Sequence, residues 1–177
     1  MVGLQIVLCN LGGNLVSNDI YLLSDTIVFD SKPIAVPYNY RISYKISQIM
    51  LIISLCCSRG GCSLVKLHMI SMALSSKDSM KMLLDFANGG LTEIPVVRFD
   101  PTVNRALLFA ISEKLIVQQK DGKLRLTIEG KNYISAIIKD KTLMVREKNS
   151  LNQLSTKITE KVIGDIMTNW RYQNATN

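Results

Sequence analysis

The sequence predicts an α+β fold in which a helix leads directly into a β-hairpin. Asp100 is a favoured helix N-cap residue, and Pro101 stands at the first helical position, where its missing N–H breaks no hydrogen bond. Residues 115–127 form two short apolar runs around Asp121 and Gly122, a pair typical of a type I′ hairpin turn. A helix followed by a hairpin with a basic tip is the arrangement of a winged helix, so we expect a winged-helix core.

The first 40 residues are predicted to form a β-rich N-terminal arm. Three short apolar runs, at 4–8, 20–23 and 26–29, are separated by turn-forming residues, as expected for strands. Two prolines within residues 32–39 lack an N–H and favour extended backbone, which indicates a linker. We expect this arm to dock on the main body or on a partner.

Residues 41–140 are predicted to form the winged-helix domain, with three helices before the helix that begins at Asp100. Their expected bounds are 44–58, 63–74 and 78–86. The first is apolar nearly all round, which predicts a central position. The second and third contain Met69, Met72, Met80 and Met82. These methionines are interpreted as adaptable core packing, with a Met-rich binding groove as the alternative.

Two later helices each have one apolar face. The face of the helix that begins at Asp100 comprises Val103, Ala106, Leu107, Ala110 and Ile111. Thr127 is expected to cap a helix that runs to Ile138, although Gly130 weakens its first turn. The inward-facing residues of that helix are predicted to be Tyr133, Ile134 and Ile137.

Residues 141–177 are predicted to form an amphipathic C-terminal helix and a tail. Ser150 followed by Gln153 matches the capping box that begins a helix. The apolar stripe of this helix comprises Leu151, Leu154, Ile158, Val162 and Ile166. Such a helix either folds back on the domain or docks a partner, so the residues of the stripe are our partner-binding candidates.

The composition is that of a folded chain with a basic excess. The chain is 47% hydrophobic and 20% charged, with a net charge of +7. Residues 1–62 carry four Lys/Arg and three Asp/Glu, whereas residues 63–177 carry seventeen and eleven. This excess fits contact with nucleic acid or an acidic partner, or a solvated surface. The apolar run at 46–57 is shorter than the roughly 20 residues that span a bilayer, and no secretory signal is visible, so we expect a cytoplasmic protein without membrane contact.

Few residues suit catalysis or metal binding. No phosphate loop is visible, and His68 is the only histidine. Cys57, Cys62 and His68 suggest a zinc hypothesis, but their spacing matches no standard site and a fourth ligand would be needed. A histidine within an apolar helix is more typical of a core residue. We therefore expect a non-enzymatic protein with reduced cysteines and without catalytic residues, metal or cofactor.

Nucleic-acid binding is better motivated, by two groups of polar residues. One group lies near the start of the helix that winged-helix proteins place in the DNA major groove. The other lies on the hairpin, where phosphate contacts are usual. The six candidates are Thr102, Asn104, Arg105, Lys120, Lys123 and Arg125. The alternative is that these residues are polar because both places are exposed to solvent.

Two stretches resemble a known family. They are CSLVKLHMISMAL at 62–74 and VVRFDPTVNRALLFAISEKLIVQQKDGKLRLTIEGKNYI at 96–134. Over roughly residues 44–140 the chain resembles the small middle components of bacterial three-component ABC-ATPase systems, which include the small subunit of Lamassu-type antiphage defence. The resemblance implies a winged-helix, kleisin-like subunit that links an ATPase similar to the structural-maintenance-of-chromosomes proteins to an effector such as a nuclease. The ATP chemistry would then lie in the partner.

Two functional hypotheses follow. The first is a non-enzymatic bridging subunit of an antiphage defence complex, with an ABC ATPase and an effector as partners and DNA as a third contact. The second is a stand-alone winged-helix transcription regulator that binds DNA by itself. The second predicts DNA affinity that weakens steeply as salt rises.

Overall fold

The computed structural model describes residue 37 and residues 41–57, 60–90 and 98–175. The chain divides after Pro37 into two units, and the description that follows concerns the second. The predicted N-terminal strands lie outside the described residues, as does the apolar run that begins at Ile94, for which the sequence predicts a short strand.

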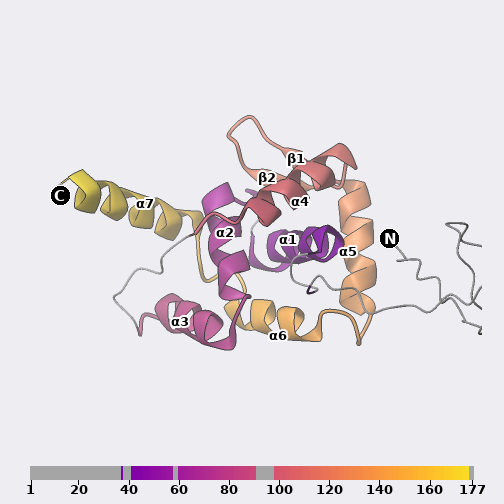
Figure 1. Ribbon diagram of the computed structural model, residues 1–177, viewed down its shortest axis with the longest axis horizontal. Helices are drawn as coiled ribbons and strands as arrows, with labels where there is room; N and C mark the ends of the chain where they lie inside the picture. Colours follow the sequence, from indigo (N-terminus) through magenta and orange to yellow (C-terminus); the bar gives the residue numbers. More distant parts are fainter. Residues whose placement is uncertain (1–36, 38–40, 58–59, 91–97, 176–177) are drawn as a thin grey trace, which may run out of the picture. The chain divides into compact units, whose positions relative to one another are not determined.

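The described chain is mostly helical and contains one antiparallel hairpin, which confirms the α+β class (Figure 1). Its elements are α1 (Ile42–Cys56), α2 (Leu64–Ala73), α3 (Lys77–Ala87), α4 (Pro101–Ser112), β1 (Ile116–Gln118), β2 (Leu124–Leu126), α5 (Ile128–Lys139), α6 (Val145–Leu154) and α7 (Glu160–Ala175). Among the described residues, no helix is both long enough and apolar enough to cross a membrane.

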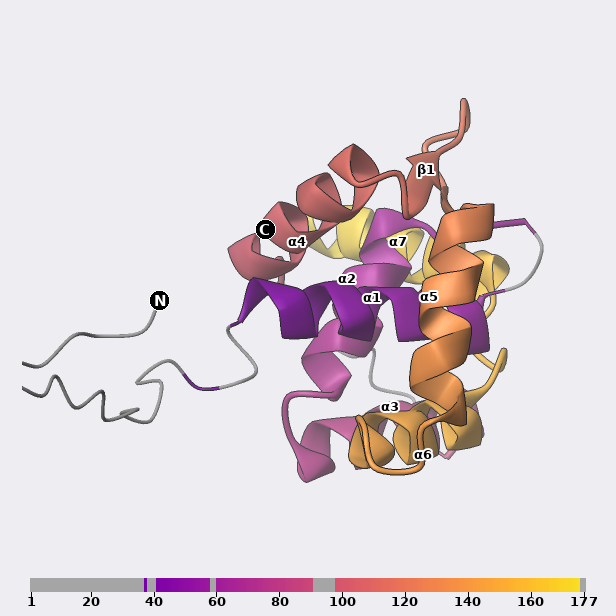
Figure 2. The same cartoon turned by 90° about the vertical axis from the view of Figure 1, so that its right-hand side faces the viewer.

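Helix α1 is the centre of the core, as its sequence predicted. The residues of α1 that are completely inaccessible to solvent are Ile49, Met50, Leu51, Ile52 and Cys56. Helices α2, α4, α5 and α6 all pack against it. Figure 2 shows α4 on one side of α1, α6 on the opposite side, and α5 crossing α1 between them.

Side-chain caps begin four of the helices. The hydroxyl or carboxylate oxygens of Ser63, Ser76, Asp100 and Thr127 accept backbone N–H groups in the first turns of α2, α3, α4 and α5. These contacts confirm the predicted helix starts at Asp100 and Thr127. Helix α4 ends with Lys114 in the left-handed conformation (φ 57°), a position that more often holds glycine.

The hairpin pairs Ile116 with Leu126 and Gln118 with Leu124, but its turn differs from the predicted type. A type I′ turn needs positive φ at both central residues, and here only Gly122 has it (φ 80°). The N–H of Gly122 donates to Gln119 O at 2.9 Å, and the N–H of Gln119 donates to Lys123 O at 2.8 Å. This is a three-residue loop closed by a glycine bulge. Alternation around Asp-Gly predicts a hairpin, but it does not distinguish these two turns.

Cys62 extends the hairpin on its other edge. It exchanges two backbone hydrogen bonds of 2.9 Å with Leu124, although it forms only an isolated bridge and not a full strand. The segment between α1 and α2 is therefore held against β2, and β2 lies between this segment and β1.

The prediction that the C-terminal helix begins at Ser150 is wrong. Ser150 lies inside α6, and the chain breaks at residues 155–159 before α7 begins. Ser155 adopts φ 47° and ψ −139°, which no helix can continue. The hydroxyl of Thr159 then accepts the N–H of Val162 at 3.3 Å and caps the new helix.

Two side-chain placements also differ from expectation. Tyr133 is exposed on α5, and only its hydroxyl reaches inward, to Ser47 Oγ at 3.1 Å. Met82 is exposed on α3, whereas Met69 and Met80 are buried as predicted. Ile134, by contrast, is buried beneath α5 as expected.

Candidate protein and nucleic-acid interface

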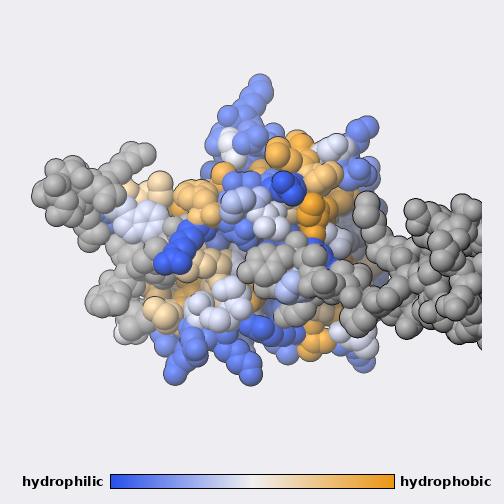
Figure 3. All heavy atoms as spheres, viewed as in Figure 1, coloured by the Kyte–Doolittle hydropathy of each residue, from blue (hydrophilic) through white to orange (hydrophobic). Residues whose placement is uncertain are grey.

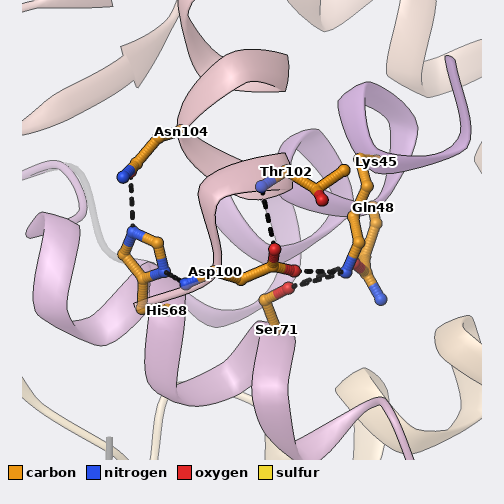
Figure 4. A network of polar contacts seen from close by, with 7 residues as sticks. All are labelled: Lys45, Gln48, His68, Ser71, Asp100, Thr102 and Asn104. Carbon is orange, nitrogen blue, oxygen red and sulfur yellow. Dashed lines mark hydrogen bonds and ion pairs between the residues drawn. The ribbon is translucent and has the colours of Figure 1, made fainter. Parts of the chain in front are cut away.

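A buried polar network fixes the start of α4 against α1 and α2 (Figure 4). The carboxylate of Asp100 accepts the N–H of Thr102 at 2.8 Å and pairs with the ammonium of Lys45 at 3.3 Å. Lys45 also donates to Ser71 Oγ at 3.4 Å, and Ser71 donates to Gln48 Oε1 at 3.2 Å. Because Lys45 is buried, this half-exposed carboxylate neutralises a charge that is largely withdrawn from water.

The electrostatics of Asp100 follow from these contacts. Burial works to raise the pKa of its carboxyl, but the N–H of Thr102 and the charge of Lys45 outweigh burial and hold that pKa below its ordinary value. Asp100 is therefore an anion at neutral pH. It acts both as the helix cap of α4 and as the counter-ion of α1.

His68 belongs to the same network and is a core residue. Its Nδ1 accepts the N–H of Asp100 at 3.2 Å, so its Nε2 carries the proton and donates to Asn104 Oδ1 at 2.9 Å. Burial lowers its pKa, and Asn104 and Asp100 offset that effect only in part. Both ring nitrogens are occupied, so His68 does not join Cys57 and Cys62 in a metal site. The described residues contain no group of three or more potential metal ligands.

The three DNA candidates on α4 have different surroundings. Thr102 and Asn104 take part in the network, which holds them in place for structural reasons. Arg105 is exposed on the outer side of α4 and makes no hydrogen bond or ion pair within the described chain. Thr102 joins the network through its backbone N–H and Asn104 through its side-chain oxygen, whereas Arg105 takes no part in it.

The three hairpin candidates also differ. Lys123 pairs with Asp121 at 3.2 Å, and Nη1 of Arg125 donates to the side-chain oxygen of Gln119 at 3.2 Å. Lys120 is exposed at the tip of the loop, with no such partner among the residues described. The structure places all three on one hairpin, next to the end of α4.

The outer side of α4 is unexpectedly apolar. Leu108 is 69% exposed and Phe109 is 48% exposed, one turn after Arg105. We call Arg105, Leu108 and Phe109 the α4 face. Hydrophobic residues gather over α4 and toward the upper part of α5 in Figure 3. Sequence reasoning assigned the inner apolar face of α4 and three polar residues near its start, and the signal it missed was two large apolar residues outside the core stripe.

A second apolar surface lies where α5 passes into α6. Leu143 is 50% exposed and lines a groove of about 460 Å³ with Tyr133 and Ile137, and Ile138 and Val145, close to it in the sequence, are also exposed. Ile138 and Val145 line a groove of about 270 Å³ together with Leu55 of α1. We call Ile138, Leu143 and Val145 the α5–α6 face. Sequence reasoning did not single out any of these residues as partner contacts.

The predicted partner-binding stripe is inside the molecule. Leu151, Leu154, Ile158 and Ile166 are buried in the core, and Val162 packs against it. The break between α6 and α7 divides the stripe between two helices that both fold back on the domain. Of the two alternatives that the amphipathic pattern left open, the structure favours folding back.

A third surface is hydrophilic and basic. Between α3 and α6 lies a groove of about 730 Å³ whose lining includes Lys77, Lys81, Arg146 and Lys157. Figure 3 shows hydrophilic residues along this edge. Arg146 donates to Leu74 O at 3.3 Å and Lys157 to Asn88 Oδ1 at 2.8 Å, so two of the four cations are already engaged.

Comparison with known proteins gives no match: no family model, no curated protein and no solved structure is similar to this chain.

Proposed function

We propose that this chain is a non-enzymatic bridging subunit of a bacterial defence complex, and that it links an SMC-like ABC ATPase to an effector such as a nuclease. The observation that carries the proposal is the pair of exposed apolar surfaces, the α4 face and the α5–α6 face. Large exposed apolar side chains in clusters are typical of protein-binding surfaces. A bridging protein needs two of them.

The two faces are far enough apart to serve two partners. The end of α4 leads through the hairpin to the N-cap of α5, where Thr127 donates its N–H to Leu115 O at 3.1 Å. The α5–α6 face lies at the other end of α5. A helix of 12 residues is about 18 Å long, so the two ends of α5 are about that far apart, and Figure 2 shows α4 and α6 on opposite sides of α1.

The family resemblance supplies the identity of the partners. The stretches at 62–74 and 96–134 contain the motifs that resemble the middle components of three-component ABC-ATPase systems. Residues of both stretches meet in the network around His68 and Asp100, which stiffens the start of α4. A stiff α4 presents its apolar face in one orientation, which favours tight docking.

The experiment is co-expression of the full chain with the products of its neighbouring genes, followed by size-exclusion chromatography and mass determination. The unsubstituted chain is expected to co-elute with both an ATPase and an effector. Leu108→Glu is expected to release one partner and Leu143→Glu the other. Ser135→Glu, on an exposed part of α5 outside both faces, is the control and should retain both partners.

Three outcomes would contradict this proposal. The chain could elute alone, both glutamate variants could release the same partner, or neither could release any. Circular dichroism of each variant would show that the fold is intact, since all three substitutions are at exposed positions.

The second candidate function is a stand-alone winged-helix DNA-binding regulator. Arg105 and Lys120 favour it, because both are exposed and make no ion pair within the described chain. A winged-helix assignment is supported by α4, the hairpin and the bridge of Cys62 to Leu124. Against it, Leu108 and Phe109 occupy the part of α4 that would face the bases. Arg105→Ala should then relax base preference, whereas Lys120→Ala should weaken binding to all sequences.

A further inference from the structure

The sheet of the hairpin has one closed edge and one open edge. Cys62 exchanges two hydrogen bonds of 2.9 Å with Leu124 and closes the edge formed by β2. Strand β1 forms the other edge, and within the described residues no further strand pairs with it. Figure 2 shows the loop of the hairpin extending beyond the helices. The edge of β1 is therefore a place where an additional strand can join the sheet.

The hydrogen-bond register determines which backbone groups point to this open edge. The N–H of Gln119 donates to Lys123 O at 2.8 Å, and the N–H of Thr127 donates to Leu115 O at 3.1 Å. Hydrogen-bonded positions alternate along an antiparallel pair of strands. Val117, midway between Leu115 and Gln119, is therefore the residue of β1 whose backbone faces β2.

The N–H and C=O groups of Ile116 and Gln118 consequently point away from β2. None of these four groups takes part in a turn, loop or cap hydrogen bond of the described chain. Donors and acceptors spaced in this way along an edge are the pattern that a neighbouring strand satisfies. Val117 between them is 47% exposed, so a joining strand would also cover an apolar side chain.

The charges beside β1 decide between a second copy of the chain and a different partner. Lys114 and Lys120 lie two residues before and two residues after β1, and both are exposed. Of the two carboxylates next to them in sequence, Asp121 is already paired with Lys123 at 3.2 Å, and only Glu113 remains. If two β1 strands paired antiparallel about their central residues, Lys114 of each copy would face Lys120 of the other. Like charges placed opposite each other destabilise such a pair, whereas carboxylates would stabilise it.

We propose that the open edge of β1 binds an extended segment of a partner protein as an additional β-strand, and that this segment has an apolar residue opposite Val117 and carboxylates near its ends. The backbone groups of Ile116 and Gln118 provide the hydrogen bonds, and Lys114 and Lys120 provide the charge preference. None of these residues belongs to the α4 face or the α5–α6 face, so the proposal does not rest on the bridging function.

NMR titration of the isotope-labelled full chain tests this proposal. The probe is a synthetic peptide of valine, threonine and valine with glutamates on both sides. In the free chain, the amides of Ile116 and Gln118 are expected to exchange with solvent at least about tenfold faster than that of Val117. Saturation with the peptide should shift the resonances of these residues and slow exchange at Ile116 and Gln118. A peptide with lysines in place of the glutamates should bind at least about tenfold more weakly.

Two controls separate strand addition from simple attraction between charges. The acidic peptide with N-methyl groups on alternate backbone nitrogens keeps its charges but loses the donors that pair with β1, so it should not bind. In the chain, Gln118→Pro removes an N–H that faces away from β2 and should abolish binding without breaking the hairpin. Gln118→Ala keeps that N–H and should bind as the unsubstituted chain does.

Several results would overturn the proposal. These are an amide of Gln118 as protected in the free chain as that of Val117, no response of Ile116 and Gln118 to the acidic peptide, equal binding of the N-methylated peptide, or binding that survives Gln118→Pro. The N-methylated peptide keeps the test informative even if the proline variant folds poorly. No ATPase or effector takes part in this titration, so its failure would leave the bridging function to be decided by co-expression.

Discussion

At the residue scale, the network between α1, α2 and α4 is fully paired. Within the described residues, no buried side-chain nitrogen or oxygen lacks a hydrogen-bond partner. Such a network stabilises one arrangement only, because each group that loses its partner leaves a desolvated polar atom behind. Asp100 and His68 are its two titratable groups with shifted pKa values, and each makes a separate prediction.

His68 should make folding stability depend on pH below neutrality. Its folded pKa is below the ordinary 6.5, so the unfolded chain binds the proton more readily. The stabilisation is therefore fully present above about pH 6.5 and is lost as the pH falls through the folded pKa. Urea unfolding at several pH values between about 7.5 and 5.5 should show this decline, since side-chain carboxyls titrate mainly below that range. His68→Gln should flatten the curve, because this is the chain's only histidine, and an unchanged slope would refute the assignment.

Asp100 should contribute more to stability than an exposed aspartate with a similar ion pair. Asp100→Ala removes the cap of α4 and leaves the buried ammonium of Lys45 without its counter-ion. We expect the free energy of unfolding to fall by about 2–4 kcal/mol. Asp121→Ala, at the exposed pair with Lys123, is the control and should leave that free energy almost unchanged. Denaturant titration compares the two, and equal losses would contradict this account.

At the element scale, the start of α5 depends on a glycine that was expected, from the sequence, to weaken the helix. Gly130 weakens a helix by its own propensity, but a Cβ at this position would overlap the carbonyl oxygen of Leu115. That carbonyl also accepts the N–H and the hydroxyl of Thr127, at 3.1 and 3.2 Å. The close approach of α5 to the start of β1 is therefore possible only without a side chain.

Substitution of two helical glycines should consequently have opposite effects. Gly130→Ala is expected to lower the free energy of unfolding by at least about 2 kcal/mol, since the obstructing atom is backbone and cannot rotate away. Gly164→Ala in α7, where an added Cβ meets nothing, should raise it by about 0.5–1 kcal/mol. Thermal unfolding of both variants checks this, and a shift of the same sign in both would count against the packing described.

The elements predicted from sequence are those whose signals are local. Asp100 and Thr127 cap their helices with groups three residues away or fewer, so the sequence alone places both starts. The break before α7 was missed because Ile158 and Ile166 continue the apolar stripe across it. The need for Gly130 was missed because it arises from Leu115, in another element.

The residues of the candidate site also divide into those that the sequence predicts and those whose role depends on contacts between elements. Arg105 and Lys120 were predicted as exposed polar groups, and the structure leaves them so. Asn104 was predicted to reach a nucleic acid, yet its side-chain oxygen binds His68, 36 positions earlier in the chain. Burial decides which apolar residues remain for a partner, and burial depends on contacts between elements that no local pattern contains.

At the scale of the whole molecule, the two proposed functions differ in the force that drives binding. DNA binding through the hairpin would rest on phosphate contacts, whose release of counter-ions makes affinity fall steeply with salt. Docking through the α4 and α5–α6 faces would rest on burial of Leu108, Phe109 and Leu143, which salt does not screen. The net charge of +7 allows either, so charge alone does not choose between them.

Salt dependence should therefore separate the two functions. If the chain is a bridging subunit, its complex should persist when sodium chloride is raised from about 0.15 M to about 0.5 M, because the Debye length is already short and the buried contacts are apolar. DNA binding by the isolated chain should weaken at least about tenfold over a smaller rise, from about 0.05 M to about 0.2 M. Lys120→Ala should reduce that salt slope without affecting the protein complex. Leu108→Glu should disrupt the protein complex without reducing that salt slope. A complex that dissociates by 0.5 M salt, and that Leu108→Glu leaves intact, would show that the basic surfaces hold the partner and that the apolar faces have another role.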